Sequence, residues 1–135
     1  MIWYDDLFVG KSISPRRKKR IIRKVNRRSI LGVEYLLTLP ANPDNLLDII
    51  STQVVRQRCY PRKDLVVIGL AGNYEEALML AGEIVTGIYA VQGNFKLREF
   101  FIILPYLSDK LIYFIPHFHL QLLDYKYLNK FYYHI

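Results

Sequence analysis

The chain has 135 residues, of which 52% are hydrophobic and 23% are charged, and its formal net charge is +7. This composition is that of a globular protein and not of a disordered tail. A domain of this length buries roughly two thirds of its unfolded surface, so it needs no disulfide or metal ion to fold. Cys59 is the only cysteine, which excludes an intramolecular disulfide and a cysteine-rich zinc site and suits a reducing compartment.

The N-terminus predicts neither export nor membrane insertion. Asp5 and Asp6 precede the first basic residue, whereas a signal peptide begins with basic residues. The most apolar stretches, 64–72 and 100–107, are shorter than the roughly 18–20 residues that span a membrane. We expect a soluble, cytoplasmic protein.

The positive charge is concentrated near the N-terminus. Residues 1–35 contain ten Lys or Arg and three Asp or Glu, whereas residues 36–135 contain nine of each kind. One basic element on an otherwise neutral chain indicates an anionic partner at a defined place.

The first elements in chain order are a short edge strand at 2–9 and a basic helix. Ser14 followed by Pro15 is a helix start signal, because the hydroxyl can cap the helix and proline fits its first turn. We expect this helix to end near Arg28. One side can dock on the rest of the protein through a narrow apolar stripe. The stripe consists of Ile21, Ile22 and Val25.

The rest of the chain alternates between strands and helices. The patterns predict helices at 42–59 and 73–93 and strands at 31–39, 64–71 and 96–104. Connections of this length favour parallel strands joined by right-handed crossovers. We therefore expect residues 1–102 to form a small three-layer α/β domain with a mainly parallel sheet and crossover helices.

The stretch from about residue 3 to 101 resembles a group of short proteins of unknown function from anaerobic Gram-positive bacteria. The features that carry the resemblance are the basic helix, YDDLFV at 4–9, EYLLTLPANPDNLLDII at 34–50 and VVIGLAGNYEEALMLAGEIV at 66–85. The resemblance implies an α/β fold shared with that group and no particular chemistry.

Residues 103–135 form an aromatic-rich C-terminal extension. They contain nine of the chain's aromatic residues and all three of its histidines. Nine aromatic side chains in water would form an exposed apolar patch. We therefore expect the extension to pack on its own domain or on a second copy in a homodimer, with disorder or another partner as the remaining alternative.

The stretch GLAGNYEE at 69–76 ends a strand and opens a helix, as phosphate-binding turns do. Its glycine spacing fits neither a dinucleotide-binding fingerprint nor a P-loop. Glu75 and Glu76 occupy the place that a phosphate would need and would repel it. We interpret the stretch as a tight turn with a capping box from Asn73 to Glu76, and a small enzyme that uses this turn stays an alternative.

Two further patterns have plain structural interpretations. His117 and His119 would share one face of a strand, but no third metal ligand is evident. Cys59 has basic neighbours that could stabilise its thiolate, but no base lies near it in the sequence. We predict no catalytic residue, no metal site and no cofactor.

The basic helix is the main candidate site. Like charges four residues apart cost a helix about 0.2–0.5 kcal/mol per pair, whereas a merely solvated helix mixes Glu with Lys. Arginine outnumbers lysine here, and its planar group suits phosphate or carboxylate oxygens. The predicted binding residues are Arg16, Arg17, Lys18, Lys19, Arg20, Arg23, Lys24, Arg27 and Arg28.

These observations predict a non-enzymatic protein that contacts the phosphate backbone of RNA or DNA through the basic helix. We expect little sequence preference, because the helix lacks the Asn or Gln reach that is typical of base recognition. The alternative is a small protein-binding regulator or inhibitor whose basic helix docks on an acidic partner surface, such as that of a nucleic-acid enzyme.

Overall fold

The computed structural model describes residues 1–29 and 32–103. The chain forms two compact units, Met1–Glu83 and Ile84–Ile135. The first unit contains a four-stranded sheet, the helices α1 (Pro15–Asn26) and α2 (Thr52–Arg56), and the start of helix α3 (Tyr74–Gln92).

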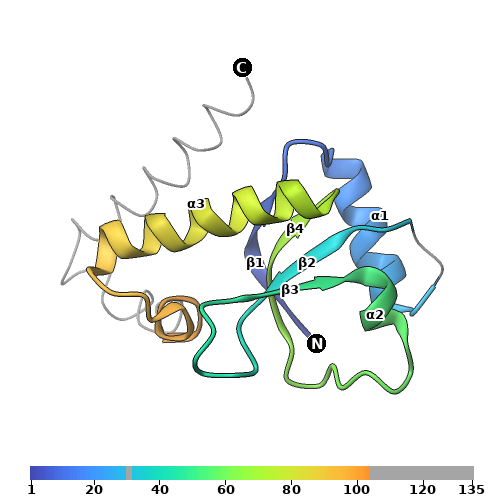
Figure 1. The fold of residues 1–135 in the computed structure, drawn as a ribbon. Coiled ribbons are helices and arrows are strands. Elements are labelled where there is room, and N and C mark those ends of the chain that lie inside the picture. Colours follow the sequence, from blue (N-terminus) through green and yellow to red (C-terminus); the bar gives the residue numbers. More distant parts are fainter. Residues whose placement is uncertain (30–31, 104–135) are drawn as a thin grey trace. The chain divides into compact units, whose positions relative to one another are not determined.

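The sheet is mixed, with the strand order β1-β4-β2-β3 (Figure 1). Strand β1 pairs with β4 in parallel, whereas β2 is antiparallel to both β4 and β3. The four strands are β1 (Ile2–Val9), β2 (Tyr35–Thr38), β3 (Asp48–Ser51) and β4 (Val66–Ala71). The α/β fold is confirmed, but the prediction of a mainly parallel sheet is wrong.

The chain's return after α1 explains this difference. Strand β2 begins at Tyr35 beside Ala71, the last residue of β4, so it runs antiparallel to β4.

The predicted helix at 42–59 is also wrong. Residues 39–47 instead connect β2 to the antiparallel strand β3, and only Thr52–Arg56 is helical.

Side chains in the connection stabilise a turn where the sequence indicated a helix start. The Asn42 side-chain oxygen accepts from the N–H of Asp44 at 3.0 Å, and the Asn45 N–H donates to the Asn42 carbonyl at 3.1 Å. The Asp48 carboxylate accepts from the Ala41 N–H at 3.1 Å and from the Asn45 side chain at 3.2 Å. Asn and Asp favour turns through such local bonds as readily as they cap helices.

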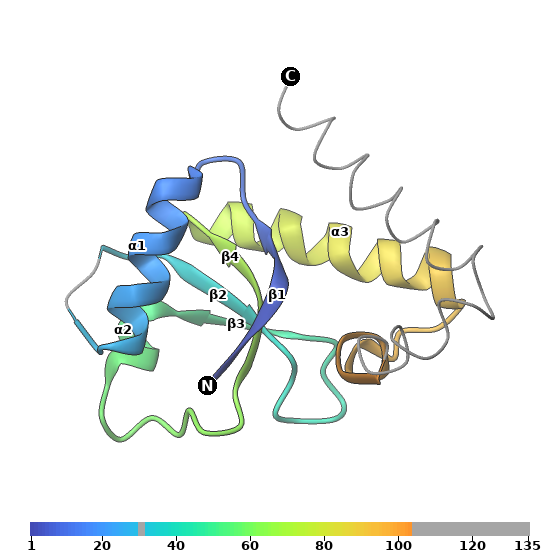
Figure 2. The same cartoon turned by 180° about the vertical axis from the view of Figure 1, so that it is seen from behind.

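Two helical elements lie on opposite faces of the sheet. The views from the front and from behind place α1 on one face and the first turns of α3 on the other (Figures 1 and 2). A buried apolar cluster joins α1 and α2 to the sheet. Each fully buried aliphatic side chain contributes about 1.5–3 kcal/mol. The cluster consists of Leu7, Ile13, Ile21, Val25, Leu36, Val55, Val67 and Leu70.

The sequence predicted a strand at 96–104, and the described part of this stretch, residues 96–103, contains no strand. A helical segment that ends in a π-helical turn, Glu99–Ile103, occupies this region. Leu97, Phe100 and Phe101 are buried, and their i, i+3, i+4 spacing is that of a helix face. Residues 104–135 lie outside the described residues, so the predicted boundary after residue 102 and the packing of the C-terminal extension stay predictions.

Candidate nucleic-acid interface

The predicted basic helix forms and begins as its sequence indicates. The Ser14 hydroxyl oxygen accepts from the backbone N–H of Arg17 at 3.2 Å, and Pro15 is the first helical residue. Ile21 and Val25 are buried against the sheet and α2 as part of the apolar cluster. The apolar stripe therefore fixes which side of α1 faces solvent.

Helix α1 ends at Asn26, two residues before the predicted end. The N–H groups of Arg28 and Ser29 donate to the carbonyls of Val25 and Lys24 at 3.1 and 2.9 Å, which is the bonding pattern of a Schellman motif. Arg28 has a φ of +54°, the left-handed conformation that usually requires glycine at this position. An arginine here costs about 1–2 kcal/mol in backbone strain, so its side chain must provide compensation.

The Arg28 guanidinium supplies that compensation at the end of α2. It donates to the carbonyl oxygens of Val55, Arg56 and Gln57, of which the first two lie at 3.4 and 3.3 Å. These carbonyls belong to the last turn and the C-cap of α2, where a helix lacks internal donors. Arg28 therefore joins the two helices.

Arg17 also has a structural partner. Its guanidinium lies 3.3 Å from the Glu34 carboxylate and donates to the Ser12 carbonyl at 3.2 Å. The Glu34 side chain is only 6% exposed, and its second oxygen has no hydrogen-bond partner among the described residues. A buried carboxylate of this kind depends on its cation, so Arg17 is needed within the fold.

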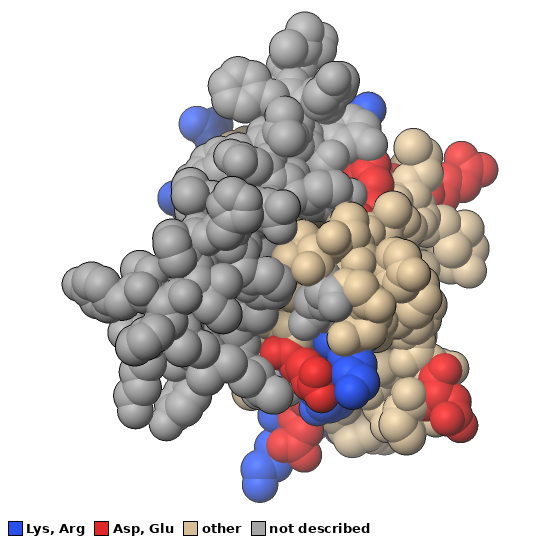
Figure 3. All heavy atoms as spheres, turned by 90° about the vertical axis from the view of Figure 1, so that its left-hand side faces the viewer, with Lys and Arg blue, Asp and Glu red and all other residues tan. Residues whose placement is uncertain are grey.

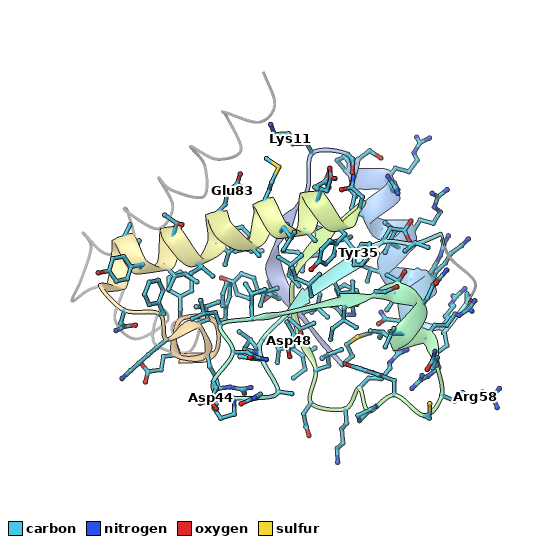
Figure 4. All side chains as sticks on the ribbon, viewed as in Figure 1. Lys11, Tyr35, Asp44, Asp48, Arg58 and Glu83 are labelled. Carbon is cyan, nitrogen blue, oxygen red and sulfur yellow. The ribbon has the colours of Figure 1, made fainter. Side chains whose placement is uncertain are left out.

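The solvent side of α1 carries charge of one sign. We call five exposed basic residues the basic face, of which four belong to α1 and the fifth, Arg27, is its C-cap. Positions 16, 20, 23 and 27 follow one another at about one turn, and Lys19 lies beside Arg20. In the described part of the chain none of them forms an ion pair. Figure 4 shows nitrogen-tipped side chains that project from α1 away from the strands. The basic face consists of Arg16, Lys19, Arg20, Arg23 and Arg27, while Lys18 and Lys24 are half-buried beside it.

This concentration of charge contrasts with the side of the molecule that Figure 3 shows. There, acidic and basic side chains of the described residues lie among uncharged ones. The stretch 11–33, which contains α1, has no acidic residue at all. The largest local excess of positive charge therefore lies at α1 and its flanking residues.

The structure adds a second basic segment, residues 56–63, that the sequence did not connect to α1. The Arg62 guanidinium donates to the carbonyls of Val25 and Asn26 at 3.0 and 3.3 Å, at the C-terminal end of α1. Its charged neighbours Arg58 and Lys63 are exposed, and Figure 4 shows Arg58 beyond α2. The only sequence signal was the run of basic residues around Cys59.

Like-charge repulsion on the basic face predicts an unusual effect of neutral substitutions. Replacing Arg16, Arg20, Arg23 and Arg27 by Gln removes several like-charge pairs while keeping helix propensity. We expect the free energy of unfolding to rise by about 1 kcal/mol at low salt. The gain should shrink at about 0.5 M salt, where the charges are screened. Urea denaturation at both salt concentrations measures this, and a variant less stable than the native protein at low salt would contradict it.

The turn at 69–76 holds the protein's own carboxylate in place of a bound anion. Glu76 accepts from the Gly72 N–H at 3.0 Å, the Ser12 hydroxyl at 3.0 Å and the Ser12 N–H at 3.3 Å. The Asn73 side chain caps α3 by accepting from the Glu76 N–H at 2.8 Å, as predicted. In a capping box the Glu76 carboxylate would accept from the backbone N–H of the capping residue. Here it accepts from Gly72 and Ser12 instead, so its bonds reach the loop between β1 and α1.

The other candidate residues do not assemble into a site in the described residues. His117 and His119 lie outside them. Cys59 is exposed, and its thiol lies 3.9 Å from the side-chain oxygen of Gln57. No group of three metal-ligating side chains occurs within residues 1–29 and 32–103. In the same residues no helix has the length and apolar character needed to cross a membrane.

Comparisons with known proteins leave the fold and the basic face as the basis for assigning function. No family model, curated protein or solved structure matches this chain.

Proposed function

We propose that the protein is a non-enzymatic nucleic-acid-associated protein that contacts the phosphate backbone through the basic face, with little sequence preference. The main support is that five exposed cations lie along α1 and its C-cap, while the other side of the helix is buried. Regularly spaced guanidinium groups can each donate two hydrogen bonds to phosphate oxygens. Arg17 and Arg28 are left out of this contact surface, because their guanidinium groups have partners within the fold.

The composition of the basic face favours nucleic acid over an acidic protein. The buried centre of a protein–protein interface is rich in aromatic and apolar side chains. Of the described residues, those with exposed large apolar side chains all lie outside α1. A contact made by charges alone is the pattern of phosphate recognition.

The expected salt dependence follows from the number of exposed cations. Each phosphate neutralised contributes about −0.9 to the slope of log affinity against log salt on duplex DNA. The five cations of the basic face therefore contribute about −4 to −5 to the slope. Different sequences of equal length should give nearly equal affinities, because phosphate contacts carry no sequence information.

The test is fluorescence anisotropy of the purified, nuclease-treated protein with labelled RNA and DNA across a salt series. We expect R16Q/R20Q/R23Q/R27Q to lose most of its binding and the magnitude of its salt slope to fall by about 3–4. The matched control, K96Q/R98Q/K126Q/K130Q, removes the same number of positive charges from elsewhere in the chain. It should bind nearly as tightly as the native protein.

Three results would overturn the proposal. One is an absence of binding by the native protein at low salt, which would direct the search to an acidic protein partner. Another is equal binding by the native protein and the four-Gln variant. The third is an equal loss in both variants, which would mean that net charge alone, and not the basic face, controls the interaction.

A further inference from the structure

A second basic element of the same unit lies beside the C-terminal end of α1. Arg28 donates to carbonyls of the last turn of α2, and Arg62 donates back to carbonyls at the end of α1. Each guanidinium is held by fixed backbone groups in the opposite element. The second basic segment is therefore placed beside the end of the basic face before any ligand binds.

The junction between these elements is crowded with positive charge. The second basic segment has four basic residues and no acidic one, and Asp64 follows it directly. Arg58 and Lys63 are exposed, and Arg56 is half-buried. Burial lowers the pKa of Arg62, and the neighbouring charge of Arg28 lowers it further. An anion that bridges the two elements would relieve this repulsion.

We infer that the second basic segment is a second phosphate anchor, so that one double-helical nucleic acid is contacted both by α1 and by Arg58 and Lys63. The inference rests on the proposed function and specifies its ligand.

The shape and composition of the surface favour a duplex over a single strand. Proteins that bind single strands stack bases on aromatic side chains. The described residues of α1 and of the second basic segment include one aromatic residue, Tyr60, which is half-buried against the apolar cluster. The basic face is also straight and rises about 16 Å from Arg16 to Arg27, at 1.5 Å per residue. A duplex presents phosphates at fixed positions to such a row, whereas a flexible strand must first be ordered.

The test compares a 20-base-pair duplex of DNA, the same duplex of RNA, and the separate strands, each over a salt series. We expect the native protein to bind at least one duplex more tightly than its strands. The variant R58Q/K63Q should lower the magnitude of the duplex salt slope by about 1–2. The control K96Q/R98Q removes two charges from the second unit and should leave the slope unchanged. Both substituted side chains in R58Q/K63Q are exposed, and urea denaturation verifies that the variant is folded.

The outcomes separate this inference from the proposed function. If R16Q/R20Q/R23Q/R27Q loses binding while R58Q/K63Q retains the native slope, the second anchor is refuted and the proposed function stands. Tighter binding to single strands than to either duplex refutes the duplex ligand in the same way. If the native protein binds no nucleic acid, the proposed function and the inference fail together.

Discussion

Gly10→Ala should destabilise the protein by about 2–3 kcal/mol, although Gly10 has an ordinary φ and needs no glycine for its backbone conformation. The reason is close approach. A Cβ on Gly10 would overlap Oε1, Cδ and Cγ of Glu76. The carboxylate would have to leave its position, and it would lose its bonds to the Ser12 hydroxyl and to the N–H groups of Ser12 and Gly72. Hydrogen bonds to a charged group contribute about 1.5–3 kcal/mol each when well formed, and partial solvation of Glu76 reduces the total.

A double-mutant cycle measures this effect. Glu76→Ala should cost about as much as Gly10→Ala, because both remove the same bonds. The double variant G10A/E76A should then be no less stable than either single variant. Urea denaturation of the four proteins gives the coupling energy, and strictly additive losses would contradict the prediction.

This cycle also bears on the phosphate-binding interpretation of GLAGNYEE. The donors that such a turn offers to an anion are the N–H groups and hydroxyl that Glu76 already occupies. A phosphate at that position would have to displace a carboxylate from the same chain. The sequence predicted that Glu76 would keep a phosphate out of this turn. In the structure the Glu76 carboxylate occupies the donors that a phosphate would need.

Local signals predicted the elements that depend on few residues. Ser14, Pro15 and the spacing of the apolar stripe were sufficient to predict α1, and the continuous apolar run was sufficient for β4. The stretch 42–51 was predicted wrongly, because Asn and Pro serve both helix starts and turns. The antiparallel pairing of β3 with β2 shows that this stretch forms a turn and a strand and does not start a helix, and that pairing has no local sequence signal.

The sequence likewise predicted only part of the candidate site. Composition identified the nine basic residues, but burial decides which of them are available. Arg17 and Arg28 are held by partners far along the sequence, at Glu34 and at the end of α2. The addition of the second basic segment likewise depends on Arg62 reaching the end of α1 across 36 and 37 positions of sequence. Such contacts are properties of the fold and have no local pattern.

Arg17→Met should destabilise the protein by about 2–3 kcal/mol. It leaves the Glu34 carboxylate without a cation, while one of its oxygens already lacks a hydrogen-bond partner in the described residues. Removing one member of a buried pair costs about 3–5 kcal/mol, and the one-third exposure of the Arg17 side chain reduces that value. The variant R17M/E34L should recover most of the loss, because two apolar side chains leave no charge unpaired.

Binding measurements on the same variants distinguish structural arginines from contact arginines within one helix. R17M/E34L, once shown to be folded by urea denaturation, should bind nucleic acid with nearly the native salt slope. Arg16→Gln removes a residue of the basic face and should lower the magnitude of that slope by about 1. A slope lowered equally by both changes would mean that Arg17 exchanges its bond to Glu34 for a phosphate on binding. In that case the ion pair, and not only the exposed row, would belong to the contact surface.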